Sequence, residues 1–178
     1  SVDNCGNSYV TGNGIGGSAD IFLAKYDPHG NLIWVKQPEG SGIDRALEIT
    51  LDESDNIYIT GFFNWWISGT DSGIVIFEDD TLISKGNADI FIAKYDSDGN
   101  MLLVKQAGGK YQDQGSAISV DLLGNIIITG SFNDTIIFDN SDTLVADSSD
   151  VFVAKYDSTG NVLWVRQFGG KYYDESVG

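Results

Sequence analysis

The sequence predicts an all-β fold built from repeated antiparallel units, and three observations lead to this prediction. First, a string containing Ala-Lys-Tyr-Asp occurs three times, with its aspartate at Asp27, Asp96 and Asp157. Second, short alternations of apolar and polar residues, rich in β-branched and aromatic side chains, flank every copy and have the period of a strand. Third, no segment has the 3.6-residue period of an amphipathic helix. Repeats of this spacing are typical of solenoids, propellers and arrays.

Two kinds of string alternate along the chain, and both contain the pattern Asp-x-x-Gly-Asn. In such a pattern the aspartate accepts backbone N–H groups of its own turn, and the glycine supplies the positive φ that closes a hairpin. Asp55 replaces this glycine in one copy, and aspartate tolerates positive φ better than most residues do. The strings of the first kind span residues 1–12, 50–61 and 119–130, and those of the second kind span 19–37, 88–106 and 149–167.

Successive turns predict four-stranded antiparallel meanders. Units of this size are typical of β-propeller blades, so we predict a partial propeller of three blades at about 1–44, 45–113 and 114–178, within a longer multi-blade protein. Two blades are expected to carry inserted hairpins, at 73–77 with 81–83 and at 135–138 with 142–146. The predicted strands are 7–11, 20–26, 32–37, 46–51, 56–62, 89–95, 101–106, 117–120, 125–132, 150–156 and 162–167.

The alternating strings resemble a known repeat family. Val-Asp-x-x-Gly-Asn-x-Tyr-x-Thr-Gly and Phe-x-Ala-Lys-Tyr-Asp-x-x-Gly-Asn-x-x-Trp-x-x-Gln-x-Gly-Gly are similar to the SBBP-type β-propeller repeats of bacteria, across essentially the whole chain outside the inserts. The resemblance implies secreted or cell-surface bacterial proteins, often large and multidomain. It implies no enzyme activity and supplies no catalytic residues.

Charge and composition narrow the classes of partner. The formal net charge of −16 repels nucleic-acid phosphates and anionic lipid head groups, so neither is an expected partner. No apolar run is long enough for a membrane-spanning helix. His29 is the only histidine and Cys5 the only cysteine, which argues against a catalytic triad, a multi-histidine metal site and an internal disulfide.

The variable joins between strands predict where binding takes place. In a meander the inserts and the Gly-Gly joins lie at one end of the strands, and the Asp-x-x-Gly-Asn turns lie at the other. Variable loops on a rigid scaffold commonly carry function. The ligand-binding residues expected at the insert end are Trp65, Trp66, Tyr111, Tyr172 and Tyr173. The alternative is that the two tryptophans only cover the neighbouring blade.

Metal binding and other repeated positions have structural interpretations. Asp96, Asp98 and Asn100 resemble the start of a calcium loop, but the spaced glutamate that completes an EF-hand is missing. We therefore predict no metal and no cofactor, with calcium as the weaker alternative. Trp34 and Trp164 are expected to pack between blades. The repeated lysines are expected to pack their stems there too, with each ammonium near a carboxylate; they are Lys25, Lys94 and Lys155.

Three classes of function follow. The first is a non-catalytic extracellular module that binds a protein or glycan or serves as a scaffold. The second is a structural stalk or filament segment of a surface protein. The third is a polysaccharide-acting enzyme with an acidic cleft. Three blades do not close a ring, so the expected further partners are neighbouring blades of the same protein, or a second copy forming a homodimer that completes the ring.

Overall fold

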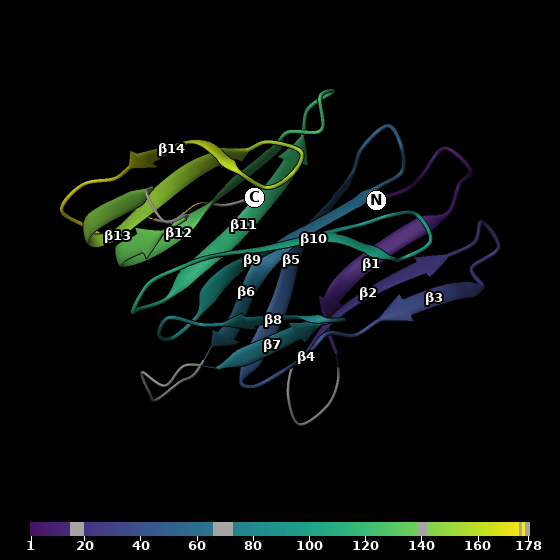
Figure 1. Cartoon of the computed structure of the whole chain (residues 1–178), viewed down its shortest axis with the longest axis horizontal. Coiled ribbons are helices and arrows are strands. Elements are labelled where there is room, and N and C mark those ends of the chain that lie inside the picture. Colours follow the sequence, from purple (N-terminus) through teal and green to yellow (C-terminus); the bar gives the residue numbers. More distant parts are fainter. Residues whose placement is uncertain (15–19, 66–72, 139–141, 175, 177–178) are drawn as a thin grey trace.

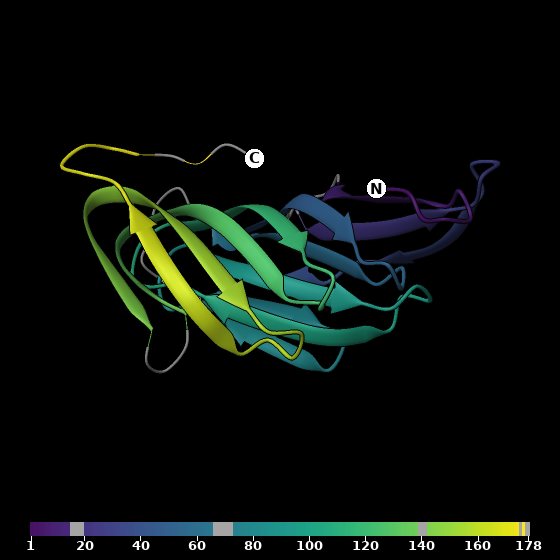
Figure 2. The same cartoon turned by 90° about the horizontal axis from the view of Figure 1, so that it is seen from above.

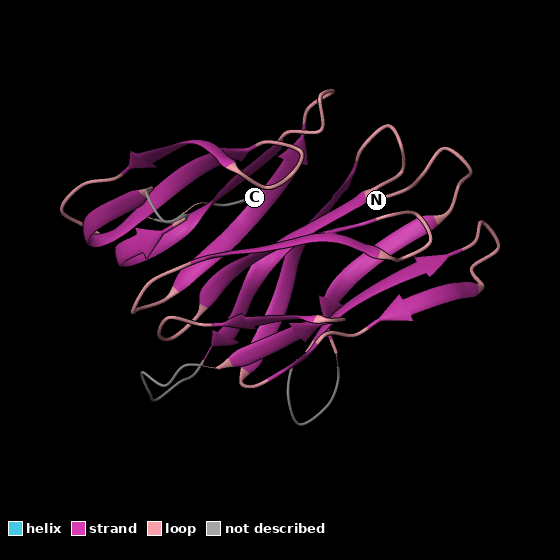
Figure 3. Ribbon diagram, viewed as in Figure 1, coloured by secondary structure: helices cyan, strands magenta, loops and turns pink. Residues whose placement is uncertain are grey.

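The computed structural model describes residues 1–14, 20–65, 73–138, 142–174 and 176, and their regular structure consists of strands (Figures 1 and 3). None of these residues lies in a helix, so the described part has no helix that could cross a membrane. The predicted all-β class is confirmed.

Three of the four antiparallel sheets lie side by side along the long axis of the molecule (Figure 2), and the fourth is a small sheet at the insert end. We call the three that lie side by side the first, second and third blades. The first contains β1 (Ser8–Asn13), β2 (Ile21–Tyr26) and β3 (Leu32–Lys36). The second contains β5 (Ile43–Leu51), β6 (Ile57–Trp65), β9 (Asp89–Tyr95) and β10 (Met101–Ala107). The third contains β11 (Asp113–Val120), β12 (Ile126–Ile137), β13 (Thr143–Tyr156) and β14 (Val162–Phe168).

The second and third blades are four-stranded meanders, with strand orders β5-β6-β9-β10 and β11-β12-β13-β14. The first blade has three strands, and Val2 forms only a short bridge with Ser8 beside β1. The predicted propeller blades are therefore present. The tight turns gather at one end of the strands and the inserts at the other (Figure 1).

The two inserts are built differently. In the second blade the insert is a separate hairpin of β7 (Ile74–Phe77) and β8 (Asp80–Ile83). In the third blade it is a continuation of β12 and β13 beyond a register shift between Asn133 and Thr135. Asp134 has a φ of 60° at this shift, so the ladder bends and continues instead of ending.

Each insert pairs with the preceding blade. β4 (Glu39–Gly40), in the join that follows the first blade, pairs with β7 of the second. Gly108, in the join that follows the second blade, bridges to Ile137 of the third. Each insert is therefore a variable loop that also joins two consecutive blades by backbone pairing, and we call these two paired regions clasps.

The apolar core lies between blades. One cluster combines Tyr9 and Leu23 of the first blade with Phe91 of the second, and another combines Tyr58 of the second with Phe152 of the third. Trp34 packs against the first of these clusters, and its Nε1–H donates to the carbonyl of Ser97 at 3.4 Å. Trp164 differs from the expectation: its side chain is 37% exposed on β14, the last strand of the third blade.

Aspartates at the insert end are buried. Asp113 accepts the N–H of Gly109 at 2.7 Å, Asp44 accepts that of Asn64 at 2.7 Å, and Asp89 accepts the side-chain amide of Gln106 at 2.7 Å. Burial raises the pKa of Asp44 to about 7, that of Asp89 to about 6 and that of Asp113 to about 8. The Asp113 carboxylate thus caps the join that follows β10, and Asp44 holds the end of β6.

Replacing Gly109 with alanine should destabilise the protein by about 1–3 kcal/mol, because the added Cβ would lie 1.8 Å from the backbone carbonyl oxygen of Thr135. Gly170 occupies the same position in the next join and has no atom within 4 Å of such a Cβ, so G170A should stay within about 0.5 kcal/mol of wild type. Urea unfolding of both variants measures the difference. Equal midpoints for G109A and G170A would contradict the clasp.

The free energy of unfolding should fall as pH rises from about 5 to 9. The raised carboxyl pKa values mean that the folded state binds more protons than the unfolded state, whose carboxyls titrate near 3.8. This stabilisation is complete below pH 3.8 and is lost as the pH passes through about 6 to 8. At about 1.4 kcal/mol per pKa unit the total change is on the order of several kcal/mol.

Asp113→Asn tests the origin of this pH dependence. The variant should gain stability relative to wild type as pH rises, since its buried amide does not ionise. Asp174→Asn, at the half-buried equivalent position, is the matched control. Chemical unfolding at pH 5, 7 and 9 gives the three curves, and parallel curves for D113N and wild type would assign the dependence to other groups.

Candidate functional site

A cavity of about 430 Å³ opens at the insert end of the seam between the second and third blades, where β11 lies against β5 and β6. Ile43, Arg45 and Leu47 are alternate residues of β5 and therefore share the face that lines it. Its other walls come from β6 and β11. The full lining is Ile43, Arg45, Leu47, Phe62, Trp65 and Gln114.

A smaller hollow of about 130 Å³ adjoins this cavity and shares Trp65 and Gln114 with it. We call the two together the Trp65 cleft. The residues that the hollow adds are Gln112, Ser131, Asn133, Ser149 and Tyr173. Strands of both blades and the segment after β14 thus contribute to one surface.

The position of Trp65 depends on the residue before it. Asn64 is fully buried with a φ of 63°, and its backbone N–H donates to Asp44. Its side-chain amide donates to the hydroxyl of Ser84 at 2.8 Å and to the carbonyl of Gly86 at 3.2 Å. These bonds hold the end of β6, and the half-buried Trp65 ring packs on Phe62 with centroids 5.0 Å apart.

The structure brings together two of the aromatic residues predicted at the insert end. Trp65 and Tyr173 line the same hollow. Tyr111 and Tyr172 are 43% and 85% exposed and lie outside the lining of the cleft. Trp66 lies outside the described residues.

Six polar residues of the cleft were not predicted from sequence: Arg45, Gln112, Gln114, Ser131, Asn133 and Ser149. A signal for two of them exists, since Arg45 and Gln114 each directly follow a strand-end aspartate that recurs in every blade. On a strand, a residue next to a buried one points to the opposite face. That alternation places Arg45 and Gln114 toward the opening.

The chemistry of the cleft is that of binding rather than of acid–base catalysis. Its described lining offers three aromatic side chains, amides, hydroxyls and one guanidinium, and it includes no carboxylate. Asp44, Asp89 and Asp113 lie near this end but are 0% exposed. The described lining of the Trp65 cleft thus lacks the pair of accessible carboxyl groups that glycosidic hydrolysis ordinarily uses.

The turn that resembles a calcium loop has the hydrogen bonds of a hairpin turn. The Asp96 carboxylate accepts the N–H of Asp98 at 3.0 Å, and the N–H and side-chain amide of Asn100 at 2.8 Å each. Among the described residues, no three His, Cys, Asp or Glu side chains are grouped so as to hold a metal ion. Calcium binding stays an untested alternative.

Comparison with known proteins supports the repeat architecture. No family model matches the chain. The chain is 33% identical, over 187 aligned residues, to an uncharacterized WD repeat-containing protein of Acanthamoeba polyphaga mimivirus. The match covers 93% of this chain but only 12% of that protein's length. Together with the meander sheets, this similarity supports a β-propeller repeat architecture, without singling out the bacterial repeats that the strings resemble.

Proposed function

We propose that the chain is a non-catalytic binding module of the β-propeller type and that the Trp65 cleft is its ligand-binding surface. The observation that carries this proposal is the convergence of Trp65, Tyr173 and several amide side chains from two blades on one open hollow. Aromatic side chains with a polar rim supply apolar contact area and orienting hydrogen bonds together.

The ligand that best fits this cleft is a neutral polar one. Arg45 is the only group of the described lining that is charged at neutral pH, while amides and hydroxyls line the hollow. A sugar residue could stack on Trp65 while its hydroxyls bond to Gln112 and Asn133, so we propose a glycan. A polar segment of a protein partner is the second candidate, favoured by the similarity to a WD repeat-containing protein.

A scaffolding role is supported by the outer face of β14. Trp34 and Leu103 hold this position in the first two blades, and each packs against the glycine turn of the next blade, at Gly99 and Gly160 respectively. Trp164 is exposed at the equivalent place in the third. We propose that a neighbouring blade of the same protein, or a second copy, covers it. The secreted or cell-surface location stays a prediction from the repeat resemblance.

Trp65→Ala should reduce ligand binding at least about tenfold, because aromatic anchors at the centre of a surface commonly contribute 2 kcal/mol or more. Tyr172→Ala is the matched control, since Tyr172 is 85% exposed and lies outside the cleft. A glycan array followed by titration of each positive glycan provides the measurement.

A second variant and a measurement of thermal stability complete this test. Arg45→Met should weaken the same ligand while leaving the packing of Trp65 on Phe62 unchanged, and thermal unfolding of each variant shows whether the fold is intact. Binding that is kept in folded W65A but lost in Y172A would move the site to the exposed loop. Turnover of any glycan by the wild-type chain would contradict the non-catalytic assignment.

A further inference from the structure

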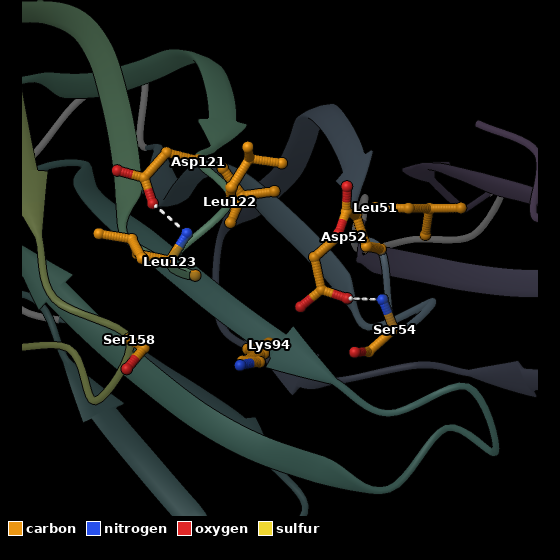
Figure 4. A pocket seen from close by; sticks show the side chains of 11 residues that line it. Leu51, Asp52, Ser54, Lys94, Asp121, Leu122, Leu123 and Ser158 are labelled. Carbon is orange, nitrogen blue, oxygen red and sulfur yellow. Dashed lines mark hydrogen bonds between the residues drawn. The ribbon is translucent and has the colours of Figure 1, made fainter.

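A second cavity, of about 370 Å³, lies at the opposite end of the seam from the Trp65 cleft. It opens between the tight turn that follows β5 and the one that follows β11, with Lys94 of β9 between them (Figure 4). Its volume falls in the range of about 300–1,000 Å³ that is usual for ligand pockets.

Lys94 differs from its two counterparts. Lys25 donates to the carbonyl of Ser97 at 2.9 Å, and Lys155 forms an ion pair with Asp121 at 2.8 Å. The ammonium of Lys94 lies 5.0 Å from the ring centroid of Tyr58 and has no hydrogen bond or ion pair with the described residues. Its donors are therefore available to a ligand that enters the cavity.

The carboxylates beside Lys94 already accept hydrogen bonds from other groups. Asp52 accepts four hydrogen bonds, from Ser54, from the backbone and side chain of Asn56, and from the hydroxyl of Tyr58. Asp121 likewise accepts bonds from Leu123, from Asn125 and from Lys155. Both side chains are held in their turns, so neither is free to move to Lys94, although both leave negative charge at the rim.

Leu122 and Leu123 form the apolar side of the cavity (Figure 4). They are 83% and 80% exposed, and they occupy the two variable positions of an Asp-x-x-Gly-Asn turn. The other turns carry no large aliphatic side chain at these positions, where the sequence reads Asn-Cys, Pro-His, Glu-Ser, Ser-Asp and Ser-Thr. Leu123 contributes only its backbone N–H to the turn hydrogen bonds. Together with Leu51 and Val120, which also line the cavity, the two leucine side chains form an apolar wall, and contiguous apolar surfaces commonly mark contact sites.

We propose that this cavity binds an extended peptide segment of a partner protein that carries an apolar side chain next to a basic one. A backbone carbonyl of the peptide would accept from Lys94, as the Ser97 carbonyl does from Lys25. The apolar side chain would pack on Leu122 and Leu123. This site is separate from the Trp65 cleft and does not depend on the function proposed for it.

The basic side chain follows from charge. Asp52, Asp121 and the exposed Glu53 line the cavity together with Lys94, and Lys155 pairs with Asp121 from outside the lining. Three carboxylates thus outnumber two ammonium groups there, and the whole chain carries a net charge of −16. An anionic peptide would therefore be repelled on approach, whereas a cationic one would be attracted.

A phage-displayed library of random dodecapeptides, selected on the immobilised 178-residue chain, tests the proposal. Selected sequences should share an apolar residue beside lysine or arginine. Synthetic copies, titrated by calorimetry, should bind Lys94→Met about tenfold more weakly, because a charged hydrogen-bond donor is lost. The double variant Leu122→Asn with Leu123→Ser, which gives the turn small polar residues, should show a similar loss without a change of fold.

The controls separate this site from others. Lys110→Met removes a lysine that lies over Tyr111 at 5.2 Å, at the other end of the strands, and should bind the peptides as wild type does. Trp65→Ala should also leave them bound. Failure to enrich any peptide, selection of acidic peptides, or equal binding by wild type, K94M and the leucine double variant would overturn the proposal.

Discussion

The aspartate side chain of each tight turn makes the interaction on which the rest of the structure depends. In the six turns that begin at Asp3, Asp27, Asp52, Asp96, Asp121 and Asp157, one carboxylate oxygen accepts backbone N–H groups two and four residues later, and the other accepts the side-chain amide of the asparagine. The residue before the asparagine has positive φ, including Asp55 at 59°. These hydrogen bonds and the positive φ close each three-residue loop in one register, and the register decides which side chains face the neighbouring blade.

The same carboxylate also explains a difference between the blades. In the first and second blades the hydroxyl of Tyr9 or Tyr58 donates to the turn aspartate, at 3.1 and 2.9 Å. Ile127 replaces the tyrosine in the third blade, and Lys155 supplies the missing donor to Asp121. In the second blade the Tyr58 hydroxyl already donates to Asp52, so Lys94 does not take this place. One substitution on a neighbouring strand thus changes what a repeated lysine can bind.

Local patterns were sufficient to predict the strands and turns, because those depend on residues close together in sequence. Strand β9 matches its predicted range of 89–95, and Asp55 adopts the positive φ expected of it. The clasps between Gly108 and Ile137 and between β4 and β7 join residues far apart, so no local period could indicate them. The Trp65 cleft was predicted only in part for the same reason, because Trp65 and Tyr173 come together through the packing of two blades. The only sequence signal for Arg45 and Gln114 is that each directly follows a repeated aspartate.

Both candidate sites lie on one seam, and Gly115 of β11 lies between them. A Cβ at Gly115 of β11 would lie 2.5 Å from the hydroxyl of Thr60 and 3.3 Å from the carbonyl oxygen of Gly61 on β6. The absence of a side chain there lets the two strands approach closely between the two sites. Beyond this contact Leu51, Val120 and Lys94 line the cavity toward the tight turns, and Trp65 and Gln114 line the cleft toward the inserts. One seam therefore carries two openings of different chemistry, because the residues of the turns line one opening and those of the joins and inserts line the other.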